Sequence, residues 1–224
     1  MMAIDPYLTD CVERIAGFKR MIPSVVTPEF LDADIFLATH SHPDHLDKDA
    51  LPFFAKRPAA FFIGSADCEA SYKSAGIYGN RFKILRVGDE IKIGDFHVRA
   101  TYADHGNLAP DAIGYLISAG GITIYNVGDS AYVPEKILKS LGNAKVDVMI
   151  APINGAYGNL DASEACILAA SIKPKILIAS HFWMFVEHGG DPAKFLEESK
   201  KLSGTKAVVM APEEVMIIEP EDSF

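Results

Sequence analysis

The feature that most constrains this chain is a run of six residues that holds three histidines and an aspartate: His40-Ser41-His42-Pro43-Asp44-His45. With seven His in 224 residues, composition alone would give this spacing in roughly one such chain in 2,000. The apolar run 35–38 directly before it predicts a buried strand that ends at Thr39. The alternative interpretation is a polar helix-capping turn in which the histidines have no common role.

A strand that ends in this motif can present ligands to two metal ions. In extended backbone, residues two apart point the same way, so His40 and His42 can bind one ion. Pro43 predicts a turn into a helix, which would direct Asp44 and His45 toward a second ion. Neutral imidazoles and carboxylates are suited to Zn, Mn or Fe rather than to Cu(I) or an iron–sulfur cluster.

Three more candidate ligands follow other predicted strands. His105 comes after one such strand, Asp129 lies just past the strand predicted over 122–127, and His181 ends the strand predicted over 176–180. Open sheets place ligand sites at the carboxyl ends of their strands, so we expect these residues to lie close to the motif. Taken singly, Asp129 could be a turn residue, and His105 or His181 could be an ordinary loop histidine.

The whole chain, residues 1–224, is predicted to form one α/β domain, because short apolar runs alternate with amphipathic helices. Hairpins are predicted around Gly94-Asp95 and Ala119-Gly120-Gly121. Helices are predicted over residues 65–76, 134–142, 161–171 and 192–204. Two short strands, 207–210 and 215–218, are expected at the end of the chain.

Composition and charge limit the classes of function. The chain has 21 Lys and Arg against 30 Asp and Glu, which argues against nucleic acid or an anionic membrane as the main partner. No apolar run reaches the roughly 18 residues of a membrane span, and the N-terminus lacks the features of a signal peptide. The three cysteines are far apart and indicate reduced thiols. We therefore expect a cytoplasmic protein that acts on a small molecule.

Together these motifs resemble the metallo-β-lactamase superfamily of metal-dependent hydrolases, which implies an α/β fold of the αββα type. The similarity covers nearly the whole chain and is greatest to the L-ascorbate-6-phosphate lactonase-like branch. The segments that carry the branch similarity are residues 4–7, the metal motif extended to Asp47, residues 128–132, 153–159, and His181 followed by 190–192. Flavodiiron oxygen reductases of the same fold usually have Glu where this chain has His42, and they append a flavin domain. Hydrolysis is therefore favoured over redox chemistry.

The resemblance also implies a role for each candidate ligand. The first ion would be bound by three imidazoles, those of His40, His42 and His105. The second ion would be bound by Asp44, His45 and His181, and Asp129 would bridge the two ions. The family would fill both sites with zinc or manganese. Two adjacent divalent ions lower the pKa of a bridging water to about 7. Asp129 would hold the resulting hydroxide, and Asp44 could orient it or accept its proton.

The chain departs from the family pattern at its N-terminus. Family members normally have strands before the Ile4-Asp5-Pro6 segment, including a Gly-His element near the site. This chain starts at that segment, so we expect an αββα sandwich that lacks the usual first strands. An unpaired sheet edge would result unless another chain covers it, which makes a homo-oligomer possible.

Several further residues keep two interpretations. Asp47 is either a hydrogen-bond partner of a ligand histidine or a solvated helix residue. His97 and His188 are expected on the surface. The others could either line the pocket or belong to turns and core, namely Tyr132, Asn154, Tyr157, Asn159, Phe182, Trp183, Met184 and Phe185.

Three functions are compatible with these features. The first is lactonase-like hydrolysis of a small anionic ester, a lactone or a phosphorylated sugar derivative, as the resemblance implies. The second is a phosphodiesterase or nuclease of the same superfamily. The third is a scaffold that binds metal and is catalytically silent.

Overall fold

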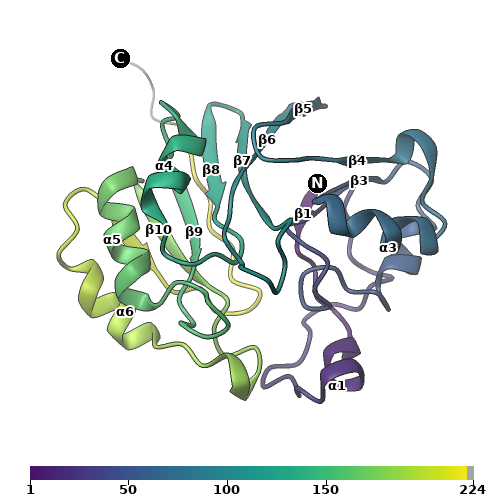
Figure 1. The fold of residues 1–224 in the computed structure, drawn as a ribbon, viewed down its shortest axis with the longest axis horizontal. Coiled ribbons are helices and arrows are strands. Elements are labelled where there is room, and N and C mark those ends of the chain that lie inside the picture. The colour runs from purple at the N-terminus through teal and green to yellow at the C-terminus, as the bar shows by residue number, and fades with distance from the viewer. Residues whose placement is uncertain (221–224) are drawn as a thin grey trace.

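The protein is described by a computed structural model covering residues 1–220, and its strands form two sheets (Figure 1). The four-stranded sheet consists of β1 (Met2–Ile4), β2 (Ile35–Ala38), β3 (Phe61–Gly64) and β4 (Phe82–Ile84), in that order. All its neighbouring strands are parallel. The helices between them are α1 (Cys11–Ala16), α2 (Leu51–Ala55) and α3 (Glu69–Ser74).

The second sheet has seven strands and is mixed. Its strands are β5 (Glu90–Ile93), β6 (Phe96–Tyr102), β7 (Ile113–Ala119), β8 (Ile122–Asn126), β9 (Val148–Pro152), β10 (Ile176–Ser180) and β11 (Lys206–Val208), in the order β11-β10-β9-β8-β7-β6-β5. Strands β5 to β8 pair antiparallel, and β8 to β11 pair parallel. The helices of this half are α4 (Pro134–Leu141), α5 (Ala162–Ile172) and α6 (Pro192–Ser199).

The two sheets pack face to face, with helices on both outer sides. Strand β2 is buried on both faces, and its residues alternate between two apolar clusters. Ile35 and Leu37 pack with Val98 of the seven-stranded sheet, whereas Phe36 packs with Phe54 of α2. Another cluster joins the outer face of the seven-stranded sheet to α4, α5 and α6, which lie on the left in Figure 1. The layers are therefore those of an αββα sandwich, as the sequence predicts.

Several local predictions are confirmed. Gly94 and Asp95 connect β5 to β6, and Gly120 and Gly121 connect β7 to β8. Helix α5 begins with a capping box in which the Asp161 carboxylate accepts from the Glu164 backbone N–H. Helix α4 ends at Leu141, and Gly142 follows with a positive φ of 59°, a conformation that favours glycine. All three cysteines are free and buried.

Other boundaries differ from the prediction. After Pro43 the backbone forms successive turns, and the helix begins only at Leu51. Helix α6 ends at Ser199 rather than near Gly204. Residues 215–218 form no strand; Val215 and Ile217 are exposed, and Met216 and Ile218 are half-buried. Strand β1 lies at the edge of its sheet and pairs with β2. Across residues 1–220, no helix combines the length and apolar character needed to cross a bilayer.

Candidate metal centre

All seven predicted ligands follow the carboxyl ends of strands, and the three strands of the seven-stranded sheet that carry ligands run in the same direction. The motif follows β2, whereas His105, Asp129 and His181 come after β6, β8 and β10. Strand β6 is antiparallel to β7, and β7 is antiparallel to β8, so β6 and β8 point the same way. The ligand atoms of these residues fall into overlapping groups, within each of which the atoms are at most 4.8 Å apart.

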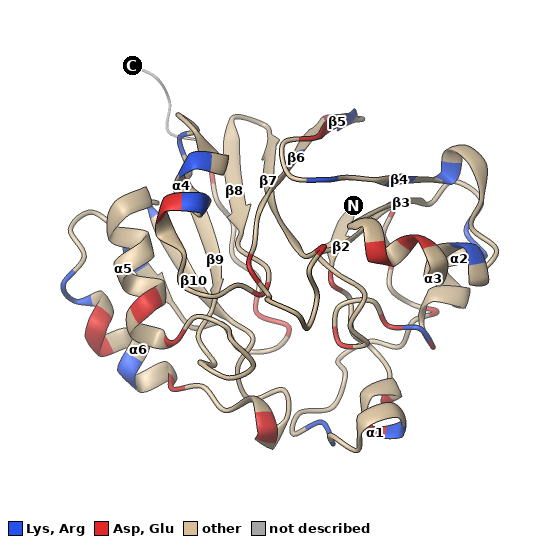
Figure 2. Ribbon diagram, viewed as in Figure 1, with Lys and Arg blue, Asp and Glu red and all other residues tan. Residues whose placement is uncertain are grey.

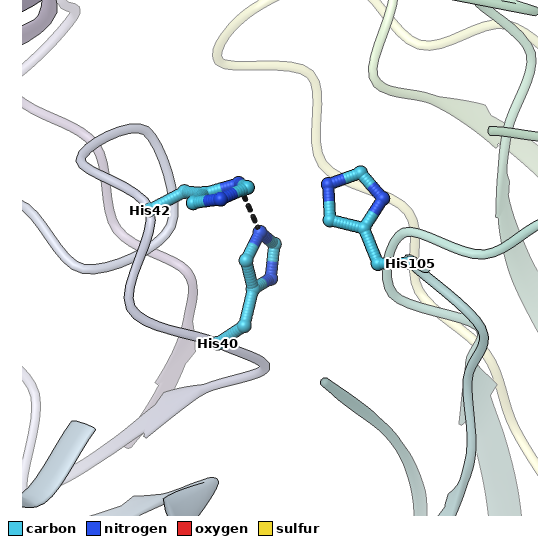
Figure 3. Close-up of side chains that lie close together, drawn as sticks. All are labelled: His40, His42 and His105. Atoms are coloured by element: carbon cyan, nitrogen blue, oxygen red, sulfur yellow. Dashed lines mark hydrogen bonds between the residues drawn. The ribbon is translucent and has the colours of Figure 1, made fainter. Parts of the chain in front are cut away.

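The first group consists of the imidazoles of His40, His42 and His105. His40 Nε2 lies 2.9 Å from His42 Nδ1, and the His105 ring centroid is 5.1 Å from the centroid of each of the other two rings. Figure 3 shows the rings converging, with His40 and His42 on one chain segment and His105 on another. Burial, reinforced by the neighbouring His45, lowers the pKa of His40 well below its usual value, so this imidazole is neutral and able to bind a cation.

The second group consists of Asp44, His45 and His181. His45 Nε2 and His181 Nε2 are 3.1 Å apart. The Asp44 Oδ2 atom lies 3.6 Å from His45 Nε2 and 3.5 Å from His181 Nε2. His181 has a positive φ of 55°, which is uncommon for a residue with a side chain and turns the chain sharply after β10.

Asp129 lies between the two groups. Its Oδ2 atom is 3.5 Å from His45 Nε2, 3.3 Å from His181 Nε2 and 3.9 Å from His105 Nε2. Burial opposes ionisation of this carboxyl, but His181 and His45 outweigh burial and hold its pKa well below the usual range. The Asn159 side-chain amide donates a hydrogen bond of 2.9 Å to the same Oδ2 atom. Asn159 therefore belongs to the site, the pocket role that the sequence left open.

The donor set fits divalent metal ions. It combines buried imidazoles with carboxylates, the ligands that zinc and manganese take. Burial alone would lower the pKa of His45, yet the surrounding carboxylates, with Asp129 first among them, raise it well above its ordinary value. This concentration of negative charge favours a cation at the centre of the site. His105 Nδ1 and His181 Nδ1 have no hydrogen-bond partner among residues 1–220.

Asp5 supports the site in a way that the sequence did not indicate. Its Oδ2 atom lies 2.9 Å from His45 Nδ1 and accepts a hydrogen bond of 2.8 Å from Thr39 Oγ1. Its Oδ1 atom accepts from the Thr39 backbone N–H at 2.7 Å. A carboxylate on the far nitrogen of a ligand histidine fixes the tautomer and the orientation of the ring. Asp5 thus fills the role considered for Asp47.

Asp47 has a different function, and neither of its predicted interpretations is correct. Its carboxylate is buried and accepts hydrogen bonds from the backbone N–H groups of Leu8, Thr9 and Ala50 and from the Thr9 hydroxyl. These contacts join the segment before α1 to the turns that follow the metal motif. Asp47 therefore stabilises the loop that carries the ligands and has no ligand histidine as a partner.

His188 was expected on the surface and is instead buried in the site, with 6% exposure. Its ring stacks on His181 with centroids 4.6 Å apart, and its Nε2 atom lies 3.8 Å from Asp44 Oδ2. Burial lowers its pKa to about 4. The sequence held no signal for this position, because His188 lies in a short 3-10 turn placed by tertiary contacts with Phe185 and Tyr157.

Of the remaining open residues, four border hollows that reach the candidate ligands, namely Tyr157, Phe182, Met184 and Phe185. Phe185 is fully buried and packs against Tyr7, and Trp183 is exposed, its indole N–H donating to the Gly190 carbonyl. His97 is exposed, as predicted, and pairs with Glu90. Tyr132 and Phe182 are partly buried and pack against the cluster that joins the seven-stranded sheet to its helices, and Met184 packs against the cluster that contains Phe185. Asn154 is buried, and Tyr157 is exposed.

Comparison with known proteins agrees with this geometry. The family model described as "Beta-lactamase superfamily domain" matches residues 6–182. The chain belongs to this superfamily. Among curated proteins, it is 32% identical to a UPF0173 protein of Pyrococcus furiosus over 80% of both chains. It is 30% identical to a UPF0173 metal-dependent hydrolase of Thermoplasma acidophilum, over 94% of this chain and 87% of the relative.

A solved structure shows the same superfamily fold. The metallo hydrolase Igni18 of Ignicoccus hospitalis superimposes with a TM-score of 0.76 at 22% identity, over 95% of this chain and 88% of that one. The family model and the curated relatives place the chain in the UPF0173 family of metal-dependent hydrolases within the beta-lactamase superfamily. The lactonase-like branch expected from the sequence stays a prediction.

Proposed function

We propose that this metal-dependent hydrolase cleaves a small carbonyl ester or lactone with the help of two divalent ions. The observation that carries the proposal is the position of Asp129, whose Oδ2 atom lies within 3.9 Å of His105 from one group and within 3.3 Å of His181 from the other. A carboxylate that borders two imidazole-rich groups is arranged to bridge two cations. His40, His42 and His105 would hold one ion, and Asp44, His45 and His181 the other.

Bound divalent ions would supply a water of lowered pKa and polarise the carbonyl under attack. The protein's own residues would do the rest. Asp129, fixed by the amide of Asn159 at 2.9 Å, would orient the attacking water. Asp44, whose pKa lies below the usual range because His45 and His181 outweigh its burial, would be ionised and able to accept a hydrogen bond from that water. Asp5 would keep His45 Nδ1 protonated, so that Nε2 faces the site.

The distribution of charge supports a small substrate rather than a polynucleotide. Figure 2 shows Lys and Arg mixed with Asp and Glu on α1, α4 and α6. Nucleic-acid sites require clustered basic residues. The net charge of −9 acts in the same direction. Nucleic acid is therefore not part of the proposal.

The proposal is tested by metal content and turnover in one preparation. The zinc- or manganese-loaded protein is analysed by mass spectrometry and assayed on 4-nitrophenyl acetate, a γ-lactone and bis(4-nitrophenyl) phosphate. Two bound ions with turnover of the ester or lactone would support the proposal. Turnover of the phosphodiester alone would indicate the phosphodiesterase alternative. Two bound ions without any turnover would indicate a catalytically silent scaffold.

A matched pair of histidine variants shows whether the activity belongs to this site. His105→Ala removes a buried imidazole of the first group. His97→Ala removes an exposed imidazole on β6, the strand that precedes His105, where it pairs with Glu90. We expect His105→Ala to abolish turnover and His97→Ala to retain it. Equal activity of the two variants would place the reaction elsewhere.

A further inference from the structure

We propose that the cleft at the metal centre accepts an uncharged substrate and receives its apolar part on one wall of the cleft. This apolar wall consists of Val12, Ile15, Phe18, Leu108, Tyr157 and Phe185. The inference rests on the proposed function and narrows its substrate class. Of the esters and lactones considered above, it selects those without a carboxylate or phosphate group.

Several hollows border candidate ligands among residues 1–220, and one of them borders both groups. A cleft of about 230 Å³ is lined by His42 and His105 of the first group and by Asp44 and His181 of the second. A hollow of about 360 Å³ reaches Asp44, His45 and His181, but none of the first group. Asp129 borders both hollows. A substrate that uses both ions must therefore approach through the smaller cleft.

The apolar wall of this cleft is partly solvent-exposed. Ile15 is 50% exposed and Leu108 55%, whereas Phe185 is fully buried. The Phe18 ring lies 6.2 Å from the Phe185 ring and 6.3 Å from the Tyr157 ring, measured between centroids. Apolar and aromatic side chains next to a few converging polar groups are typical of small-molecule sites. An apolar substituent placed here would leave water on binding.

No lysine or arginine lines this cleft within residues 1–220. Three basic residues stand near the wall in sequence. Lys19 is exposed and does not line the cleft, whereas Arg14 and Arg20 are already engaged. Arg14 pairs with Asp49 at 2.6 Å, and Arg20 stacks on the Tyr7 ring and donates to backbone carbonyls. Arg86 lines a different hollow, which borders only His105 among the candidate ligands. A carboxylate or phosphate on the substrate would therefore find no lysine or arginine to pair with among the lining residues.

The metal ions would not supply the missing positive charge. Two divalent ions bring four positive charges. The carboxylates of Asp5, Asp44 and Asp129, which lie at or next to the ligand groups, together with a bound hydroxide would balance them. Asn159, another polar side chain of the cleft, is a neutral amide and needs no negatively charged partner. An uncharged substrate is therefore the one that this lining complements.

The inference is tested with two esters that differ in one charged group, phenyl acetate and 4-acetoxybenzoate. We expect kcat/KM, corrected for the uncatalysed hydrolysis rates, to be at least tenfold higher for phenyl acetate. Ligand-observed NMR titration of the metal-loaded protein with acetophenone and 4-acetylbenzoate, ketones that the protein cannot hydrolyse, gives a second readout that needs no turnover. Here too the uncharged compound should bind at least tenfold more tightly. Equal or tighter binding of 4-acetylbenzoate would overturn the inference, whether or not either ester is hydrolysed.

A matched pair of lysine variants assigns the selectivity to the apolar wall. Ile15 lies near the end of α1, where a lysine is compatible with the helix. In Ile15→Lys the preference for phenyl acetate should fall about fivefold, the effect of a unit charge about 4 Å away in water. Ile167→Lys is the control, because Ile167 is 51% exposed on α5 and lines neither hollow.

The outcomes separate the two proposals. An unchanged preference in Ile15→Lys, or an equal change in Ile167→Lys, would refute a role for the apolar wall. Absence of turnover on every ester, with the expected difference in binding, would refute the proposed hydrolysis and leave the binding preference standing. Turnover with a preference for the anionic ester would support the proposed hydrolysis and refute the preference for an uncharged substrate.

Discussion

Replacing Asp5 by asparagine would test how the protein holds His45. In the native structure, Asp5 Oδ2 faces both His45 Nδ1, at 2.9 Å, and the Thr39 hydroxyl, at 2.8 Å. Asparagine retains one acceptor oxygen and gains an N–H₂ donor. If the oxygen keeps the bond to the Thr39 backbone N–H, the amide N–H₂ faces His45. His45 must then accept at Nδ1 and carry its proton on Nε2, the atom that faces His181 and Asp129.

A proton on His45 Nε2 competes directly with a metal ion. Loss of such an outer partner typically costs 10- to 100-fold in metal affinity, which corresponds to about 1.4–2.8 kcal/mol. We expect Asp5→Asn to lose the ion bound by Asp44, His45 and His181 first, while the ion at His40, His42 and His105 stays bound. The affected group includes His45 and the retained one does not.

The measurement is a competition titration against a chromogenic chelator, with metal content determined at each chelator concentration. Asp95→Asn is the matched control, because Asp95 is an exposed carboxylate in the loop between β5 and β6. Melting of the metal-free proteins would show whether Asp5→Asn unfolds the loop instead. If Asp5→Asn binds two ions with the affinity of the wild type, Asp5 does not control the His45 tautomer, and the reasoning fails.

Further predictions concern the metal ions, the bridging carboxylate and the core. His42→Ala should lose at least one ion and all hydrolytic activity; retained stoichiometry and turnover would contradict its assignment as a ligand. Asn159→Ala, which deletes the 2.9 Å bond to Asp129, should lower kcat with two ions still bound, as measured by steady-state kinetics and metal analysis. Metal at 100 times its dissociation constant should stabilise the fold by about 2.7 kcal/mol, seen as a raised melting temperature. Phe62→Ala, at a fully buried ring stacked on Phe36, should cost about 3–5 kcal/mol in chemical denaturation.

The errors of the sequence prediction have a common physical origin. The helix expected after Pro43 is replaced by turns, because Asp47 accepts hydrogen bonds from the backbone of Leu8 and Thr9. Those donors lie almost 40 residues away along the chain, and no local pattern reveals them. The same holds for His188, whose surroundings are set by contacts with His181 and Phe185.

Local signals, by contrast, were reliable where the interaction itself is local. The capping box at Asp161 and the hairpin at Gly94 depend on residues that are neighbours in sequence. All four residues of β2 are buried, and successive side chains pack on opposite faces of the sheet, which follows from strand geometry alone. These elements therefore formed where the sequence placed them.

The sequence by itself determined an α/β fold and the set of candidate ligands, because strand ends and the spacing of His and Asp are written in consecutive residues. Its family resemblance implied the αββα arrangement. Only the tertiary structure decided what surrounds those ligands. It brought His45 Nε2 to within 3.1 Å of His181 Nε2, which lies 136 positions further along the chain. It selected Asp5, 40 positions before His45, as the partner of the other ring nitrogen. It also placed beside these ligands an apolar wall in a cleft that, among residues 1–220, no Lys or Arg lines. Such contacts depend on how the two sheets and α1 pack, and packing is a property of the whole chain.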